Sequence, residues 1–257
     1  MIEVHGKLVC ESLAEVLRPS RAGLLVVDVQ NDYCSPGGTL DRTGGDISMT
    51  RGVVPAVVEM VDAARRHGVR VIWIQQTCLP DGASDSPAWI YMKRRNGVRP
   101  DHCLDGTWGQ QLVAPLEPRA DEPVVKKHRS SAFVGTDLDL ILRATRIETT
   151  IVIGVMSEGC VESTARDAAF YDYYVVLTPD CMASDVLAWH EASVTTMSGR
   201  HDMVPWREIV QHWEAATTQS AVPPSLSPAA AAATWPGLSA TTSTPSEMLQ
   251  TDYSARL

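Results

Sequence analysis

The chain has 257 residues, of which 44% are hydrophobic and 21% are charged, a balance typical of a globular protein. Its formal net charge of −9 disfavours nucleic acid and anionic membrane surfaces as partners. The 6 cysteines and 7 histidines lack the spacing of a disulfide framework or a structural metal site.

The segment 1–7 shows no charged-then-apolar signal pattern. No apolar run approaches the roughly 18 residues that a membrane span requires. We therefore expect a cytoplasmic protein without a membrane partner.

Short β-branched runs alternate with helical patterns along the chain, which is typical of βαβ units. The predicted strands are 23–28, 69–75, 122–126, 150–156, 173–178 and a short one near 201–204. Helices are predicted over 53–67, 136–145, 161–170 and 184–198. Because parallel crossovers are right-handed, the pattern predicts a three-layer αβα domain whose doubly wound, mainly parallel six-stranded sheet has the order 3-2-1-4-5-6.

Two regions depart from this alternation of strands and helices. Residues 77–121 mix tryptophan, proline and glycine with basic residues and are too long for a plain connection, so they form either a lid or pocket wall, or an interface. From residue 216 the composition turns to alanine, serine, threonine and proline. We therefore predict a folded domain over 1–215 and a flexible tail over 216–257.

Three reactive side chains are predicted to meet at the carboxyl ends of the strands, where open parallel sheets bind ligands. Asp28 ends the first strand, Lys127 ends the third, and Cys160 follows the fourth at the start of a helix. A helix start is expected to lower the pKa of the thiol. Taken singly, Cys160 could be a core residue and the two charges solvated; together they suit acid–base and nucleophilic catalysis.

Three separated motifs carry a resemblance to a known family. They are LVVDVQND at 25–32, VKKHRSSAFVGTDLD at 125–139 and GVMSEGCVESTARDA at 154–168. In this order, over roughly residues 20 to 205, they resemble the isochorismatase-like cysteine hydrolases. The resemblance implies a Rossmann-like αβα fold and hydrolysis of a C–N bond through a thioester.

The resemblance also implies roles for individual residues. Asp28 matches the general base, Lys127 the lysine that favours the thiolate, and Cys160 the nucleophile. Lys126 competes with Lys127, but neighbours on a strand point to opposite faces. A non-proline cis peptide is implied between Val155 and Met156, and the backbone N–H groups of Met156 and Cys160 are implied as the oxyanion hole.

Departures from the family's patterns narrow the expected substrate. The segment 74–80 reads IQQTCLP and lacks the Asp-x-His motif of nicotinamidase-like members, so neither a metal nor another cofactor is expected. The members named after isochorismate cleave a vinyl ether and lack the cysteine. The chain looks closest to members that act on carbamoyl or ureido compounds, such as ureidoacrylate, biuret or N-carbamoylsarcosine amidohydrolases. Family members commonly form dimers or tetramers, so a homo-oligomer is expected.

Further substrate contacts are predicted from position. Gln75 and Gln76, at the end of the second strand, could hydrogen-bond an amide or ureido group. Trp89, Trp108 and Phe133 could wall the pocket, although core packing stays open for each aromatic residue. Glu158 either contacts the substrate or caps the helix.

A second function class also fits a thiol at this position. The chain could be a non-catalytic redox sensor based on Cys160, or a small-molecule binding protein on the same fold.

Overall fold

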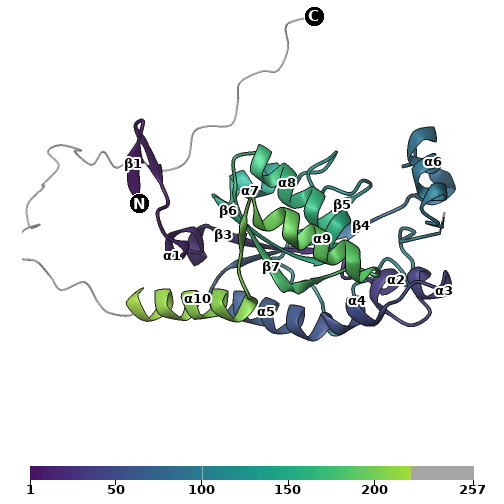
Figure 1. The fold of residues 1–257 in the computed structure, drawn as a ribbon, viewed down its shortest axis with the longest axis horizontal. Helices are drawn as coiled ribbons and strands as arrows, with labels where there is room; N and C mark the ends of the chain where they lie inside the picture. The colour runs from purple at the N-terminus through teal and green to yellow at the C-terminus, as the bar shows by residue number, and fades with distance from the viewer. Residues whose placement is uncertain (100, 221–257) are drawn as a thin grey trace, which may run out of the picture. The chain divides into compact units, whose positions relative to one another are not determined.

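The computed structural model describes residues 1–99 and 101–220 (Figure 1). Its main sheet has six parallel strands: β3 (Ala22–Val27), β4 (Arg70–Gln76), β5 (Val124–Lys127), β6 (Thr149–Val155), β7 (Tyr174–Ala183) and β8 (Asp202–Met203). They lie in the order β5-β4-β3-β6-β7-β8. Counted along the chain within this sheet, that order is 3-2-1-4-5-6, so the predicted topology is confirmed.

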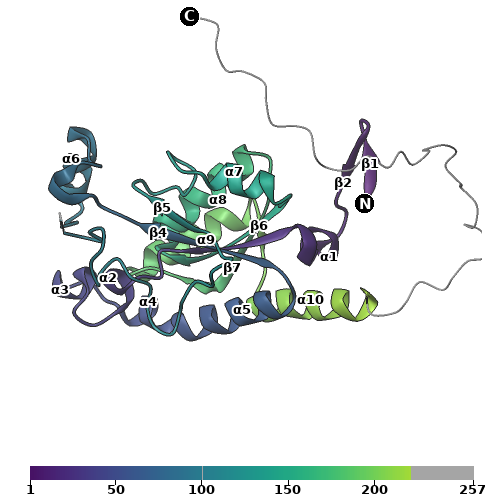
Figure 2. The same cartoon turned by 180° about the vertical axis from the view of Figure 1, so that it is seen from behind.

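Helices cover both faces of the sheet (Figures 1 and 2). One face carries α5 (Val54–Arg66) and α10 (Trp206–Ser220); the other carries α7 (Leu138–Ala144), α8 (Glu162–Phe170) and α9 (Leu187–Ser198). Successive residues of β3 enter different cores, because strand side chains alternate. Leu24 packs with the α5 and α10 side, and Leu25 packs with the α7 and α8 side.

Shorter elements connect these layers. A hairpin of β1 (Ile2–Val4) and β2 (Lys7–Val9) precedes the sheet. The short helical elements are α1 (Leu13–Val16), a 3₁₀ turn (Pro19–Arg21), α2 (Asn31–Cys34), α3 (Thr39–Arg42), α4 (Ser48–Gly52), a 3₁₀ turn (Pro80–Gly82), α6 (Pro87–Arg95) and a π-helical turn (Ser157–Val161). In both views α2, α3 and α6 lie at one end of the sheet and α1 lies at the other.

Each predicted strand and helix overlaps an observed element, but α10 was not predicted. The expected boundary at residue 216 falls inside α10, which continues to Ser220. The rest of the expected tail, 221–257, lies outside the described residues. No helix in the described part of the chain has both the length and the apolar character needed to cross a membrane.

Gly154 permits the close approach of β6 to β3 just before the site. Its φ is +119°, and a Cβ built there would stand 2.0 Å from the carbonyl oxygen of Val27. Only glycine adopts this conformation readily. The peptide bond between Val155 and Met156 is cis, as the resemblance implied.

Replacing Gly154 by alanine is expected to lower the free energy of unfolding by at least about 2 kcal/mol, because the new methyl group meets backbone that cannot move aside. Denaturant titration followed by circular dichroism measures this change. Gly52→Ala is the matched control, since nothing lies within 4 Å of its Cβ position, and it should change stability by less than about 1 kcal/mol. Equal effects from the two variants would contradict the steric argument.

Candidate active site

The structure brings Asp28, Lys127 and Cys160 together at the carboxyl ends of the strands. Lys127 Nζ lies 2.8 Å from Asp28 Oδ2 and 3.1 Å from Cys160 Sγ. The Asp28 and Lys127 side chains are completely buried, whereas Cys160 is partly exposed. Asp28 follows β3 with a φ of +53°, a left-handed conformation that turns the chain directly after the strand.

Gln76 holds the charged pair in place. Its backbone N–H donates to Asp28 Oδ1 at 2.8 Å, and its side-chain oxygen accepts from Lys127 Nζ at 2.9 Å. Gln76 and Lys127 are register partners on β4 and β5, so they face the same side of the sheet. Lys126 points the other way and pairs with Asp105 in solvent, as strand alternation predicted.

Burial and the neighbouring charges have opposing effects on the pKa values of Asp28 and Lys127. Burial raises the pKa of Asp28, although the Lys127 ammonium opposes this shift. Burial alone would lower the pKa of Lys127, but the neighbouring Asp28 and Cys160 outweigh it and raise the pKa. At neutral pH the lysine is therefore an ammonium whose charge compensates the carboxylate.

The predicted lowering of the Cys160 pKa is wrong. Burial raises the pKa of this thiol to about 12, and the nearby ammonium of Lys127 only partly offsets the effect. The Asp28 carboxylate also favours the neutral thiol. The resting site accordingly holds a thiol beside a carboxylate that can accept its proton.

Alkylation of Cys160 by iodoacetamide is expected to accelerate continuously between pH 7 and pH 9.5. The thiolate is the reactive form, and a raised pKa means that its fraction still grows about tenfold per pH unit across this window. Peptide mapping by mass spectrometry follows Cys160 separately from the other cysteines. A plateau near pH 7 would instead show the lowered pKa that the helix position suggested.

A cavity of about 620 Å³ opens at Cys160. Met156, Glu158 and Cys160 line it from the π-helical turn and its start, and Trp89 lines it from α6. Trp89, Met92, Lys93 and Arg95 are all contributed by the 77–121 segment, which therefore forms a pocket wall.

Three predicted contact residues do not line this cavity. Gln75 lies on the other face of β4 from Gln76, which does line it. Trp108 is 49% exposed, and Phe133 is buried in the core, where it stacks on Tyr171 with ring centroids 5.0 Å apart. Strand alternation explains Gln75 and core packing explains Phe133, whereas Trp108 lies on the surface.

Sequence reasoning missed a second buried ion pair beside the cavity. Lys93 Nζ lies 2.7 Å from Asp85 Oδ2 and 3.1 Å from Cys78 Sγ. These contacts anchor α6 to the segment that precedes it. Helix spacing rules do not cover them, because Asp85 and Cys78 lie in the loop before α6, eight and 15 residues before Lys93.

The spacing of cysteines and histidines along the sequence also did not reveal one group of potential metal ligands. Within the described residues, ligand atoms of Asp32, His102 and Cys103 lie within 4.8 Å of one another. Hydrogen bonds account for the arrangement, because the Asp32 carboxylate accepts from Thr39 and from the Cys103 N–H. His102 Nε2 lies 2.7 Å from the Tyr33 hydroxyl, and burial lowers the pKa of His102 to about 4. The absence of a metal cofactor stays an expectation.

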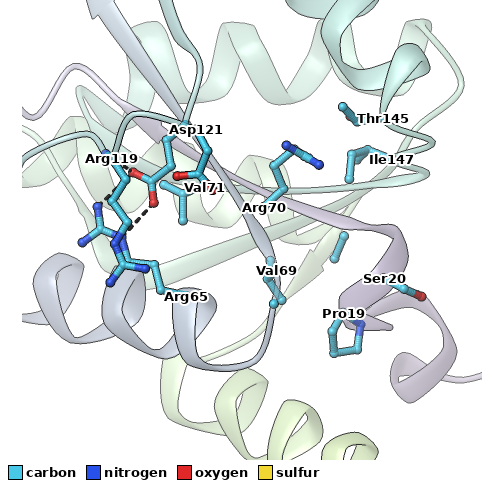
Figure 3. A pocket seen from close by; sticks show the side chains of 13 residues that line it. Pro19, Ser20, Arg65, Val69, Arg70, Val71, Arg119, Asp121, Thr145 and Ile147 are labelled. Atoms are coloured by element: carbon cyan, nitrogen blue, oxygen red, sulfur yellow. Dashed lines mark hydrogen bonds and ion pairs between the residues drawn. The ribbon is translucent and has the colours of Figure 1, made fainter.

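A smaller cavity of about 240 Å³ lies at the amino ends of the strands (Figure 3). Arg65, Arg70, Arg119 and Asp121 line it, and Arg65 is bound there by Glu122 at 2.8 Å. None of the predicted site residues lies in it. The reactive groups are thus confined to the carboxyl end, where the topology predicts a site.

Comparisons with known proteins agree with this arrangement. A family model described as the isochorismatase domain matches residues 22–205. The chain belongs to the isochorismatase family. A relative named ureidoacrylate amidohydrolase RutB, from Methylobacterium radiotolerans, is 38% identical in an alignment of 188 positions that covers 68% of this chain and 73% of the relative.

Two solved structures resemble the chain over most of their own length. A cysteine hydrolase from Pseudomonas syringae pv. phaseolicola has a TM-score of 0.68 and 26% identity, covering 77% of this chain and 95% of that one. An N-carbamoylsarcosine amidase from Thermoplasma acidophilum has a TM-score of 0.58 and 26% identity, covering 72% and 96%. The recognised family and the fold class predicted from the sequence are therefore confirmed.

Proposed function

We propose that this protein hydrolyses a C–N bond of a small amide, carbamoyl or ureido compound, with Cys160 as the nucleophile. The observation that carries the proposal is the contact of one ammonium, Lys127, with both a buried carboxylate and a thiol at the floor of a cavity. A carboxylate base, a compensating cation and a nucleophile are the groups that covalent acyl transfer requires.

The reaction begins with the neutral thiol. As Sγ of Cys160 attacks the substrate carbonyl carbon, Asp28 takes the thiol proton, so no free thiolate has to exist beforehand. The C–N bond then breaks, and the leaving nitrogen receives that proton from Asp28. A thioester remains on Cys160. Water gives a proton to Asp28 while it attacks the thioester, and the thiol is restored as the acid product leaves.

The oxyanion of the tetrahedral intermediate requires hydrogen-bond donors at the cavity wall. The backbone N–H of Met156 makes no hydrogen bond within the described part of the chain, and both Met156 and Cys160 line the cavity. These two N–H groups are our candidates for the oxyanion hole. Loss of one such donor typically costs about 3 kcal/mol in barrier height.

The relatives support an amide or ureide as the substrate. The names of two of them, ureidoacrylate amidohydrolase and N-carbamoylsarcosine amidase, describe hydrolysis of non-peptide C–N bonds. A cavity of about 620 Å³ suits a molecule of that size. By analogy with the family we also propose a cytoplasmic homo-dimer or homo-tetramer; the redox-sensor alternative is not favoured.

Ammonia release from a panel of primary amides and ureides tests the function. Wild-type protein should release ammonia or amine from at least one ureide, and Cys160→Ala should release none. Turnover that survives the substitution would rule out the thiol mechanism. Reversible oxidation of Cys160 without turnover of any compound would favour the redox sensor instead.

A further inference from the structure

Buried polar atoms without a partner gather around the candidate site. Within the described residues, three buried side-chain atoms have neither a hydrogen bond nor an ion pair: Trp89 Nε1, Glu158 Oε2 and Thr178 Oγ1. Of these, Trp89 and Glu158 line the cavity that opens at Cys160. Since buried polar groups are nearly always bonded, these exceptions point to groups that a bound molecule would satisfy.

Glu158 has the position of a contact to the reacting group. It stands two residues before Cys160 in the π-helical turn Ser157–Val161, which has no side-chain cap. No ion pair joins its carboxylate to a cation in the described part of the chain. Asp185 is a second acid in the cavity lining, and the Ser184 side chain hydrogen-bonds the Glu158 carboxyl, whose Oε2 still has no partner. An occupant that donates hydrogen bonds would relieve this local excess of acceptors.

Ureides and simple carboxamides differ in the hydrogen-bond donors beside the scissile carbonyl. A ureide has nitrogen on both sides of the scissile carbonyl, whereas a simple carboxamide has carbon on one side. During hydrolysis one nitrogen leaves with the proton from Asp28. The N–H on the other side remains and needs an acceptor close to Cys160.

We propose that Glu158 accepts the N–H of the retained nitrogen and thereby makes the site selective for ureides over simple amides. The inference rests on the proposed function and names the substrate class of the same site. A carboxamide leaves the buried Glu158 oxygen without a partner, and a buried polar group left unpaired discriminates strongly against the analogue that causes it.

Trp89 and Arg95 complement this contact at the α6 wall. The indole N–H of Trp89 is a donor without an acceptor, and Arg129 fixes the ring by lying 4.8 Å from its centroid. Arg95 lines the cavity and has no ion pair within the described residues. A substrate with an acceptor such as a carboxylate at its far end would satisfy these groups, which guides the choice of probes.

Two isosteric probes test the selectivity directly. In 3-ureidopropanoate an N–H occupies the place of one CH₂ of glutaramate, and both carry the same carboxylate. Calorimetry on the full-length Cys160→Ala protein measures their affinities without turnover. We expect the ureide to bind at least about tenfold more tightly, as one hydrogen bond to a charged group warrants.

The expected preference should depend on Glu158 alone. In Cys160→Ala/Glu158→Ala it should fall below about threefold, while Glu158→Gln, which keeps a side-chain carbonyl, should retain part of it. Asp167→Asn, on α8 and outside the cavity, should leave the ratio unchanged. Equal affinities of the two probes in Cys160→Ala, binding of neither, or a preference that survives Glu158→Ala would each overturn the inference.

Turnover separates this inference from the proposed function. If Cys160-dependent hydrolysis occurs with equal kcat/KM for both probes, the function stands and selection by Glu158 is rejected. If Cys160→Ala still hydrolyses them, the thiol mechanism itself is rejected.

Discussion

Replacing Lys127 by methionine is expected to lower the free energy of unfolding by about 3–5 kcal/mol, because it leaves the Asp28 carboxylate buried without a compensating charge. Both side chains are 0% exposed and lie 2.8 Å apart, so water cannot take over the role of the ammonium. Methionine has a similar length, which limits the loss of packing. Guanidinium unfolding followed by fluorescence measures the effect.

The partner substitution and the double variant identify the cause. Asp28→Asn should lower the free energy of unfolding by a similar amount, since it leaves the Lys127 ammonium buried without a compensating charge. Asp28→Asn/Lys127→Met should recover most of the stability while remaining inactive, because the desolvation penalty of both ions disappears. Arg99→Met, which breaks the exposed Arg99–Asp101 pair, should cost less than about 1 kcal/mol. If Lys127→Met and Asp28→Asn each lowered the free energy of unfolding as little as this control does, the account would be contradicted.

Cys160→Ser is expected to reduce kcat/KM by at least about 10³-fold while leaving the fold intact. A hydroxyl is a far weaker acid than a thiol, and Asp28 is too weak a base to deprotonate it during attack. Steady-state kinetics with the best ureide or amide of the panel measures the loss.

Cys10→Ser is the matched control for this prediction. Cys10 is also a partly exposed free thiol, but it lies away from the cavity. Its variant should keep kcat/KM within about twofold of wild type. Comparable activity losses in both variants would show that the effect is not specific to Cys160.

The topology was predictable because it depends on local patterns and on the handedness of crossovers. The apolar runs that precede Asp28, Lys127 and Cys160 end at the same edge of the sheet, so three residues distant in sequence could be assigned to one site. Strand alternation alone separated Lys127 from Lys126.

The predictions that were wrong or incomplete concern features that depend on tertiary packing and burial. Gln76 rather than Gln75 faces the site because neighbouring side chains point to opposite faces of β4 and Gln76 is the register partner of Lys127. The thiol pKa was predicted from the helix start, whereas the desolvation of Cys160 outweighs that effect. The contacts of Lys93 with Asp85 and Cys78 depend on how the loop before α6 turns, which helix spacing rules do not describe.

The protonation states explain how one site performs two proton transfers. The ammonium of Lys127 permits a buried carboxylate at Asp28, and the same burial keeps Cys160 a thiol until a carbonyl arrives. The carboxylate then receives one proton and passes it to the leaving nitrogen. A solvated carboxylate would have a lower pKa and would be a poorer proton acceptor.

Mass spectrometry of the enzyme quenched in acid during turnover of a ureide or amide tests the central claim most directly. The account predicts an acyl or carbamoyl adduct on the peptide that contains Cys160, and no adduct in Cys160→Ala. Sustained turnover with unmodified Cys160, or with the adduct on another residue, would contradict it.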